Sequence, residues 1–180
     1  VTGGMNIASD NLFRVMEIPA KRAVQDLHYR VEGPVVAHLM ETFAEDWAFT
    51  TGERLTGALW FGEISAAGDI PARGIASGPD EDNEKLMWTM ASAIGRAEKR
   101  VRIVTPYFVP DDRLGSQLAL AALRGVKVEL VLPGRSNHVY MDWAMDALLA
   151  PLLRAGCVVR RTAPPFDHSK LMTVDGAWAM

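Results

Sequence analysis

The chemically most informative residues of the sequence are His168, Lys170 and Asp175, in the pattern HxKxxxxD. In an extended strand, side chains two positions apart share a face, so we expect His168 and Lys170 to project together. An imidazole can act as nucleophile or proton donor, and an ammonium group neutralises the charge that grows on phosphoryl oxygens. Asp175 has the opposite parity, but the turn predicted at 174–176 redirects it into a supporting role. The pattern indicates attack on a phosphate ester; the alternative is a half-buried strand with one structural histidine and one solvated lysine.

A second candidate element lies near the beginning of the chain, where Gly3 and Gly4 precede Asn6. Glycine lets backbone amides approach an anion closely, and the side-chain amide of asparagine can donate a hydrogen bond to it. Gly4 and Asn6 could therefore bind an anion such as a phosphate group. The alternative is an ordinary glycine turn.

The elements that must position these residues follow an alternating pattern from residue 73 onward. Helices are predicted at about 82–97, 114–124 and 137–155, and strands at 101–104, 126–132 and 157–161. Strands alternating with helices of this length favour parallel pairing through right-handed crossovers. The sequence therefore predicts an α/β fold with a mostly parallel sheet flanked by helices.

The first 72 residues are less regular. A strand over 25–32 leads to Pro34, which suits the first position of a helix that continues to Trp47 with one apolar face. Residues 51–72 contain several glycines and a proline and are predicted to be a linker. A short strand is predicted at 73–76.

Composition narrows the function classes. The chain has 180 residues, of which 49% are hydrophobic and 23% charged, as in a folded domain. A net charge of −3 provides no general attraction to nucleic acid, and a single cysteine, Cys157, excludes an intrachain disulfide and a Cys-cluster zinc site. The sequence contains no apolar run long enough to span a bilayer. It opens at Val1 and stops at Met180 within an apolar stretch, so we expect it to be an excerpt from a longer protein.

The HxKxxxxD pattern resembles the signature of the phospholipase D superfamily, and the order of several further segments resembles its cardiolipin synthase branch. Gln25 stands where that branch has an arginine, and Asn137 where we expect an aspartate. The segments that carry the resemblance are 77–80 (SGPD), 105–111 (TPYFVPD), 124–128 (RGVKV), 132–134 (LPG) and 153–156 (LRAG).

The resemblance implies a division into lobes. Residues 1–50 would be the C-terminal part of a first phospholipase D-like lobe, 51–72 a linker, and 73–180 a second lobe truncated after its HxKxxxxD motif. In this superfamily each lobe contributes one HxK motif to a shared site, so the first motif would lie upstream of Val1. Missing lobe segments or a second subunit would be needed to complete the site.

The resemblance also implies a mechanism. One histidine attacks phosphorus to give a phosphohistidine, while the other, here His168, serves as general acid and then as base. Asp26 matches the position of a carboxylate that orients a catalytic imidazole. Residues 3–6 resemble the G(G/S)xN element of the superfamily, which implies that Gly4 and Asn6 bind phosphate together with Lys170. The expected enzyme is a phosphatidyltransferase that moves a phosphatidyl group between two phosphatidylglycerol molecules with release of glycerol, without metal or cofactor. It would act at a membrane surface, by resemblance the bacterial inner membrane, and we expect the isolated chain to be inactive.

Two other functions remain open from the sequence. The same residues would serve a phosphodiester hydrolase, either a phospholipase or a nuclease, because the residues do not reveal whether the acceptor is water or an alcohol. A non-catalytic lobe for binding or assembly is the third candidate. Nucleic acid is an unlikely partner, because Arg96, Lys99, Arg100 and Arg102 form only a modest basic cluster. That cluster is interpreted as a solvated helix end or as a contact to anionic lipid.

Overall fold

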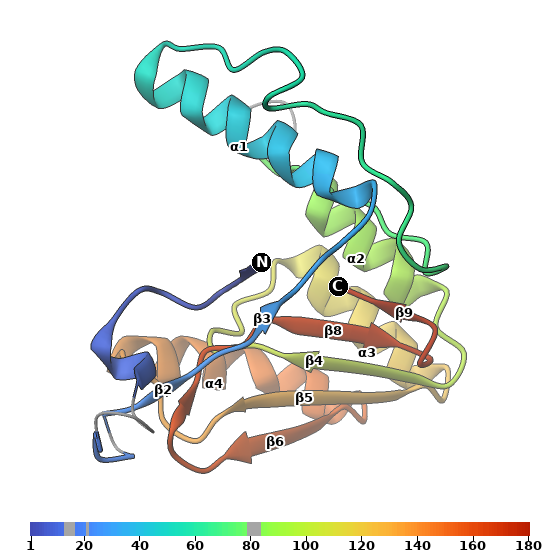
Figure 1. Ribbon diagram of the computed structural model, residues 1–180. Helices are drawn as coiled ribbons and strands as arrows, with labels where there is room; N and C mark the ends of the chain where they lie inside the picture. Colours follow the sequence, from blue (N-terminus) through green and yellow to red (C-terminus); the bar gives the residue numbers. More distant parts are fainter. Residues whose placement is uncertain (13–16, 21, 79–83) are drawn as a thin grey trace. The chain divides into compact units, whose positions relative to one another are not determined.

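The computed structural model describes residues 1–12, 17–20, 22–78 and 84–180, and it divides into two compact units (Figure 1). The first comprises Val1–Thr2 and Tyr29–Leu86, and the second comprises Gly3–His28 and Met87–Met180. All six candidate site residues belong to the second unit. The division into lobes expected from the sequence concerns a longer protein and stays a prediction.

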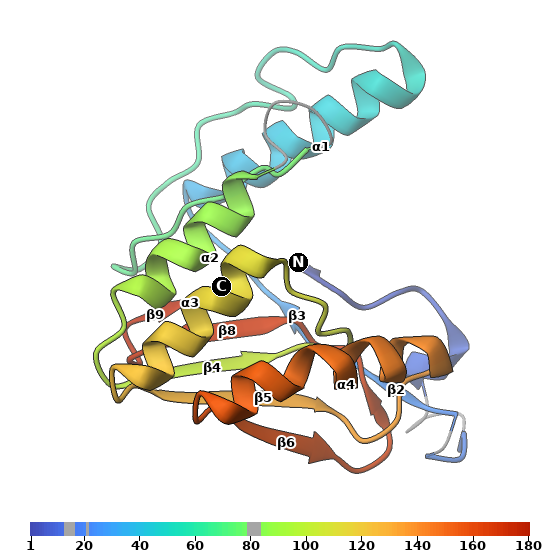
Figure 2. The same ribbon diagram turned by 180° about the vertical axis from the view of Figure 1, so that it is seen from behind.

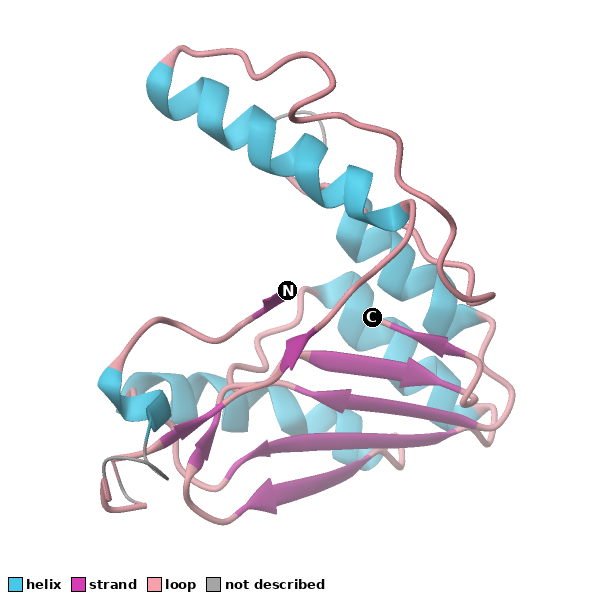
Figure 3. Ribbon diagram, in the orientation of Figure 1, coloured by secondary structure: helices cyan, strands magenta, loops and turns pink. Residues whose placement is uncertain are grey.

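The second unit is built on a five-stranded sheet with the strand order β6-β5-β4-β8-β9 (Figure 3). Strands β4, β5 and β6 pair in parallel, and β8 and β9 add an antiparallel edge. The predicted α/β class with a mostly parallel sheet is confirmed. The strands are β4 (Arg100–Val104), β5 (Lys127–Pro133), β6 (Val158–Thr162), β8 (Leu171–Val174) and β9 (Trp178–Ala179).

Three helices cover one face of this sheet: α2 (Lys85–Gly95), α3 (Asp112–Leu123) and α4 (Val139–Arg154) (Figures 1 and 2). The parallel strands β4, β5 and β6 succeed one another in a single direction across the sheet, so right-handed crossovers place α3 and α4 on the same face. Helix α3 begins where the Asp111 carboxylate accepts a hydrogen bond from the amide of Leu114 at 2.8 Å. The chain leaves this helix at Gly125, whose φ of 92° suits glycine.

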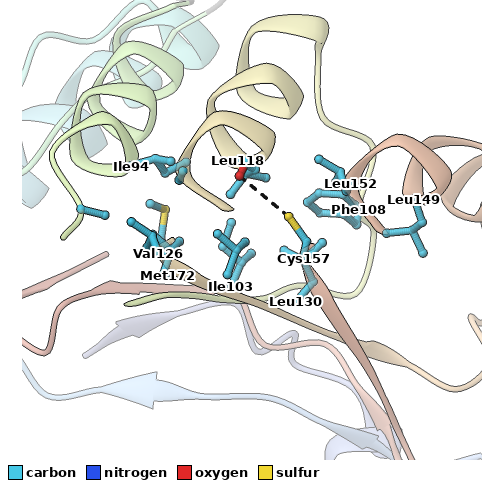
Figure 4. Packing of buried hydrophobic residues seen from close by; sticks show 14 of the residues in the cluster. Ile94, Ile103, Phe108, Leu118, Val126, Leu130, Leu149, Leu152, Cys157 and Met172 are labelled. Carbon is cyan, nitrogen blue, oxygen red and sulfur yellow. Dashed lines mark hydrogen bonds between the residues drawn. The ribbon is translucent and has the colours of Figure 1, made fainter. Parts of the chain in front are cut away.

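The core lies between the helices and the covered face of the sheet (Figure 4). Alternation along each strand directs one set of side chains inward, such as Val101 and Ile103 of β4. Leu118 of α3 and Leu130 of β5 are fully buried, and burial of one such leucine contributes about 1.5–3 kcal/mol. Cys157 is part of this core, where burial raises the pKa of its thiol.

The first unit contains one long helix, α1 (Val35–Thr51), which confirms the helix predicted after Pro34. It ends at Gly52, with a φ of 76°. None of its residues is buried, although its apolar side chains share a face as predicted. The imidazole Nδ1 of His38 accepts a hydrogen bond from the amide of Gly74 at 3.0 Å, which ties the following segment to α1.

One difference from the predicted elements lies before α2. The described residues 53–78 form no helix or strand, so the strand predicted at 73–76 is absent, and the linker role of 51–72 stays a prediction. The predicted helix start near Asp82 and the resembling residues Pro79 and Asp80 lie outside the described residues. The remaining short elements are β1 (Thr2–Gly3), η1 (Ser9–Leu12) and β3 (His28–Tyr29).

Candidate active site

A pair of two-residue strands brings the distant parts of the site together. Strand β2 (Val24–Gln25) lies parallel to β7 (Phe166–Asp167), with Val24 opposite Phe166 and Gln25 opposite Asp167. The amide of His168 donates to the carbonyl of Gln25 at 2.7 Å. The next residues in this parallel register are Asp26 and His168. The pairing therefore places a carboxylate beside an imidazole that is 142 residues away in sequence.

The carboxylate of Asp26 orients the imidazole of His168. Its Oδ2 lies 2.8 Å from Nδ1, and the Asp26 side chain is only 2% exposed. An ionised carboxylate only accepts hydrogen bonds, so a hydrogen bond between these two atoms requires the proton of the imidazole on Nδ1. The other ring nitrogen, Nε2, is then the atom that can attack phosphorus or exchange a proton with substrate. The structure thus brings Asp26 to the imidazole of His168, and its role in catalysis stays a prediction.

Lys170 places an ammonium group against the same imidazole. Its Nζ lies 2.7 Å from Nδ1 and 2.9 Å from Nε2 of His168, 2.5 Å from the His168 carbonyl oxygen and 3.9 Å from Oδ2 of Asp26. Burial lowers the pKa of Lys170, while the charges of Asp26 and Asp167 act in the opposite direction. A partly desolvated ammonium group interacts more strongly with an anion than one in bulk water. The ammonium group thus lies against the imidazole ring, and the binding of a phosphoryl oxygen by Lys170 stays a prediction.

The structure brings His168 and Lys170 together by a different route from the predicted one. Residues 168–170 lie between β7 and β8 and not within a strand. The reason is that β7 pairs with β2, whereas β8 pairs with β4 in the main sheet, so the chain crosses between two sheets at the motif. The two side chains meet through this connection and not through a shared strand face.

Of the two residues predicted to bind phosphate besides Lys170, the structure brings only Gly4 to the site. A Cβ atom at Gly4 would lie 3.0 Å from Oδ2 of Asp26 and 3.3 Å from Nζ of Lys170, closer than a side chain fits comfortably. Asn6 is exposed, and its carbonyl oxygen accepts a hydrogen bond from Nδ2 of Asn11 at 3.0 Å. Within the described residues, no hydrogen bond joins the Asn6 side chain to His168, Lys170 or Asp26.

Asp175 lies at the opposite end of β8 from Lys170. Its carboxylate accepts hydrogen bonds from the amides of Glu98, Lys99 and Arg100 at 2.9, 2.9 and 2.7 Å. These three hydrogen bonds lower the pKa of Asp175, and the bond from the amide of Arg100 contributes most. The residue has a φ of 55°, so the predicted turn is present, and it ties the end of β8 to the beginning of β4. The structure thus places Asp175 away from the imidazole, where it fixes the strand that follows Lys170.

Replacing Asp175 with asparagine keeps an acceptor of similar shape but removes its charge, and we expect the midpoint of thermal unfolding to fall by a few degrees at neutral pH. The pKa of Asp175 is lower in the folded state than its ordinary value of 3.8, so the charge stabilises the fold above that pH. This contribution is lost as the pH falls below 3.8 towards the folded-state value. The difference between wild type and Asp175→Asn in calorimetry should therefore shrink in acid. Asp69→Asn, at an exposed position, is the control; an equal loss there would contradict the assignment.

Two aromatic side chains, one from the loop after β4 and one from β7, lie next to the imidazole. The ring of Tyr107, three residues after β4, lies edge-on to His168 with centroids 6.0 Å apart, and Phe166 lies at 6.1 Å. The Tyr107 hydroxyl donates to Oδ1 of Asn137, in the loop after β5, at 2.7 Å. The carboxyl ends of β4, β5 and β6 thus converge at this edge of the sheet, where ligands of open α/β folds bind.

Sequence reasoning had not singled out Tyr107 as a site residue. A signal was present, because Tyr107 directly follows a buried parallel strand, and residues in that position gather at the carboxyl edge of the sheet. The segment 105–111 had been noted only for its family resemblance.

Residues 90–180 match the family described as cardiolipin synthase, PLD-like domain. The chain belongs to this family. The matched residues include His168, Lys170, Tyr107 and Asp175, whereas Asp26 and Gly4 lie outside the match. The resemblance inferred from the HxKxxxxD pattern and the order of the segments is confirmed.

Individual cardiolipin synthases match over most of this chain. Cardiolipin synthase 1 of Bacillus cereus is 32% identical over 183 residues, which cover 97% of this chain and 35% of the relative. Cardiolipin synthase A of Pseudomonas syringae is 41% identical over 157 residues, which cover 84% of this chain and 31% of the relative. The chain thus spans about a third of the length of these cardiolipin synthases.

Among solved structures, the phospholipase D family member Nuc from Salmonella typhimurium is similar at 25% identity with a TM-score of 0.43. The similarity covers 54% of this chain and 60% of Nuc.

Two further findings concern the described part of this cardiolipin synthase-like chain. In that part, no group of three or more histidine, cysteine, aspartate or glutamate side chains is arranged so that it could hold a metal ion. No described helix combines the length and the apolar character needed to cross a bilayer.

Proposed function

We propose that this chain is part of a longer phosphatidyltransferase of cardiolipin synthase type, which uses phosphatidylglycerol as donor and acceptor and releases glycerol. The observation that carries the proposal is the triad at the carboxyl edge of the sheet. Buried Asp26 holds Nδ1 of His168, and the ammonium group of Lys170 lies 2.9 Å from Nε2. This arrangement suits proton transfer to and from an alcohol beside a bound phosphate.

In the first half-reaction, a histidine outside this chain attacks the phosphorus atom of the donor lipid. The bond between phosphorus and the departing glycerol oxygen breaks, and Nε2–H of the His168 imidazolium gives its proton to that oxygen. Asp26 favours the imidazolium because its negative charge faces Nδ1–H. Lys170 stabilises the charge on the phosphoryl oxygens, and Gly4 leaves room for them next to Asp26.

In the second half-reaction, the hydroxyl group of a second phosphatidylglycerol attacks the phosphohistidine. Nε2 of His168, now neutral, takes the proton of this hydroxyl, and the bond between phosphorus and nitrogen breaks. Both histidines return to their initial states, and cardiolipin is formed. The histidine that attacks phosphorus would come from a missing lobe segment or a second subunit.

The proposed enzyme works at a membrane surface, and the bacterial inner membrane is the location that fits its substrate. A phosphodiester hydrolase would use the same site with water as acceptor, so the products decide between the two. A lobe that only binds would form neither cardiolipin nor a hydrolysis product.

The test is an assay of the full-length protein with vesicles of phosphatidylglycerol that carry a labelled glycerol headgroup. We expect one glycerol to be released for each cardiolipin formed. Phosphatidic acid in place of cardiolipin would assign a hydrolase, and the absence of both products would assign a binding lobe. The isolated 180-residue chain is the control and should show no turnover.

A further inference from the structure

Four basic side chains gather around one glutamate on the face of the sheet that α2, α3 and α4 leave uncovered. Figure 1 looks onto this face, with α3 and α4 behind the strands. We call it the basic face and define it by residues of β4, β5 and β6: Arg100, Arg102, Lys127, Glu129 and Arg160.

Strand alternation and register produce this cluster. Arg100 and Arg102 of β4 point away from the core, since Val101 and Ile103 between them are buried. In the parallel register, Arg100 lies opposite Lys127 and Arg102 opposite Glu129. Arg160 reaches Glu129 from the edge strand β6.

Glu129 holds all four cations. Its carboxylate lies 3.0 Å from Nε of Arg102, 3.4 Å from Nζ of Lys127, 3.4 Å from Nη2 of Arg160 and 3.7 Å from Nε of Arg100. The hydrogen bond from Arg102, with help from Lys127, lowers the pKa of Glu129 from 4.5 to about 2, so this carboxylate stays ionised at neutral pH.

The cluster carries more positive charge than Glu129 requires. Four cations and one carboxylate leave a net charge of +3 on this face, whereas the whole chain carries −3. The Glu129 side chain is 7% exposed, while those of the cations are 44–62% exposed. Like charges held close together repel one another, and one cation would suffice to balance Glu129. The fold alone therefore gives no reason for the three further cations. An anionic partner would remove this repulsion.

We propose that the basic face docks onto an anionic lipid surface. Its cations lie on three adjacent strands about 4.8 Å apart, so they present charge over an extended surface and not to one small anion. The outward positions of these strands include no aromatic residue for stacking on nucleic acid bases. Since the chain as a whole is negative, an anionic membrane attracts this face selectively and orients the protein. The inference rests on the proposed function only in taking the substrate to be an anionic membrane lipid.

The test is co-sedimentation of the 180-residue chain with vesicles of phosphatidylcholine, with and without phosphatidylglycerol. We expect binding only to the vesicles that contain phosphatidylglycerol, and binding should weaken as salt is added. In the double variant Lys127→Gln/Arg160→Gln, the partition coefficient should fall roughly fivefold for each cation removed. Arg100 and Arg102 remain to neutralise Glu129 in this variant.

The matched control is Arg96→Gln/Arg154→Gln, which makes the same change in net charge on exposed residues of the helix-covered side. It should leave vesicle binding nearly unchanged. An equal loss in both double variants would overturn the proposal, because net charge and not the basic face would then govern binding. Equal binding to neutral vesicles, or binding of duplex DNA in place of vesicles, would overturn it too.

Circular dichroism will show whether the double variant is folded. If it is not, the single variant Arg160→Gln on the edge strand replaces it, with an expected loss of roughly fivefold. The assay contains no turnover step, so it is independent of the catalytic proposal. Vesicle binding through the basic face without cardiolipin formation would refute the proposed function alone, and cardiolipin formation by a protein whose basic face is dispensable for binding would refute this inference alone.

Discussion

Replacing His168 with alanine in the full-length protein is expected to lower the turnover of phosphatidylglycerol by about 10²–10⁴-fold, the usual contribution of a positioned proton donor. The variant has no Nε2 to protonate the departing glycerol oxygen. Lys170 does not substitute well for it, because an ammonium group is a much weaker acid than an imidazolium at neutral pH. Substrate binding should change less than turnover, since Lys170 and the space at Gly4 remain.

His138→Ala is the matched control for this prediction. His138 is an exposed histidine near the same edge of the sheet, with its ring 6.2 Å from that of Tyr107, but it has no hydrogen bond to Asp26 or Lys170 among the described residues. We expect its removal to leave turnover within a few-fold of wild type. Near-normal turnover in His168→Ala would refute the role of His168, and equal losses in both variants would indicate damage to the edge of the sheet.

The chemistry of the site depends on contrasts in burial. Asp26 is nearly inaccessible: its Oδ2 contacts the imidazole and lies 3.9 Å from Nζ of Lys170, and its Oδ1 accepts a hydrogen bond from the amide of Leu27 at 2.8 Å. The ammonium group of Lys170 remains within reach of a substrate, since 46% of its side chain is exposed. In the proposed reaction, the buried carboxylate would serve the imidazole, while the exposed cation would be available to a phosphate group.

The larger elements could be predicted from the sequence because their signals are local. The run from Leu114 to Gly125 combines helical spacing of apolar residues with a glycine stop, and the structure has α3 there. The strands beginning at Arg100 and Lys127 are short apolar runs between helices, which suffices for an α/β prediction. The roles proposed for His168 and Lys170 come from the family resemblance.

The geometry of the site could not be predicted, because it depends on contacts that leave no local pattern. Strands β2 and β7 have two residues each, too short for any periodicity, yet their pairing alone sets Asp26 against His168. The turn at Asp175 was predicted, but the three amides that fix its carboxylate belong to residues 98–100, some 75 positions earlier. Glu129 has no local pattern that marks it, and only the register of three strands shows that four cations surround it.

Replacing Asp26 with asparagine should have the second large effect, a loss of turnover of about 10²-fold or more, as expected when the carboxylate that orients a catalytic imidazole is removed. An asparagine side chain can present its amide group to Nδ1, and Nδ1 then becomes the acceptor. The proton moves to Nε2, so the neutral imidazole can no longer take the proton of the attacking hydroxyl, and no negative charge stabilises the imidazolium.

Nitrogen-15 NMR of the 180-residue chain should show the proton on Nδ1 in wild type and on Nε2 in Asp26→Asn. Asp167→Asn is the charge-matched control, because Asp167 binds the amide of Ser169 in the same loop and does not contact the imidazole. An unchanged tautomer together with normal turnover in Asp26→Asn would show that the 2.8 Å contact between Oδ2 and Nδ1 has no role in the chemistry.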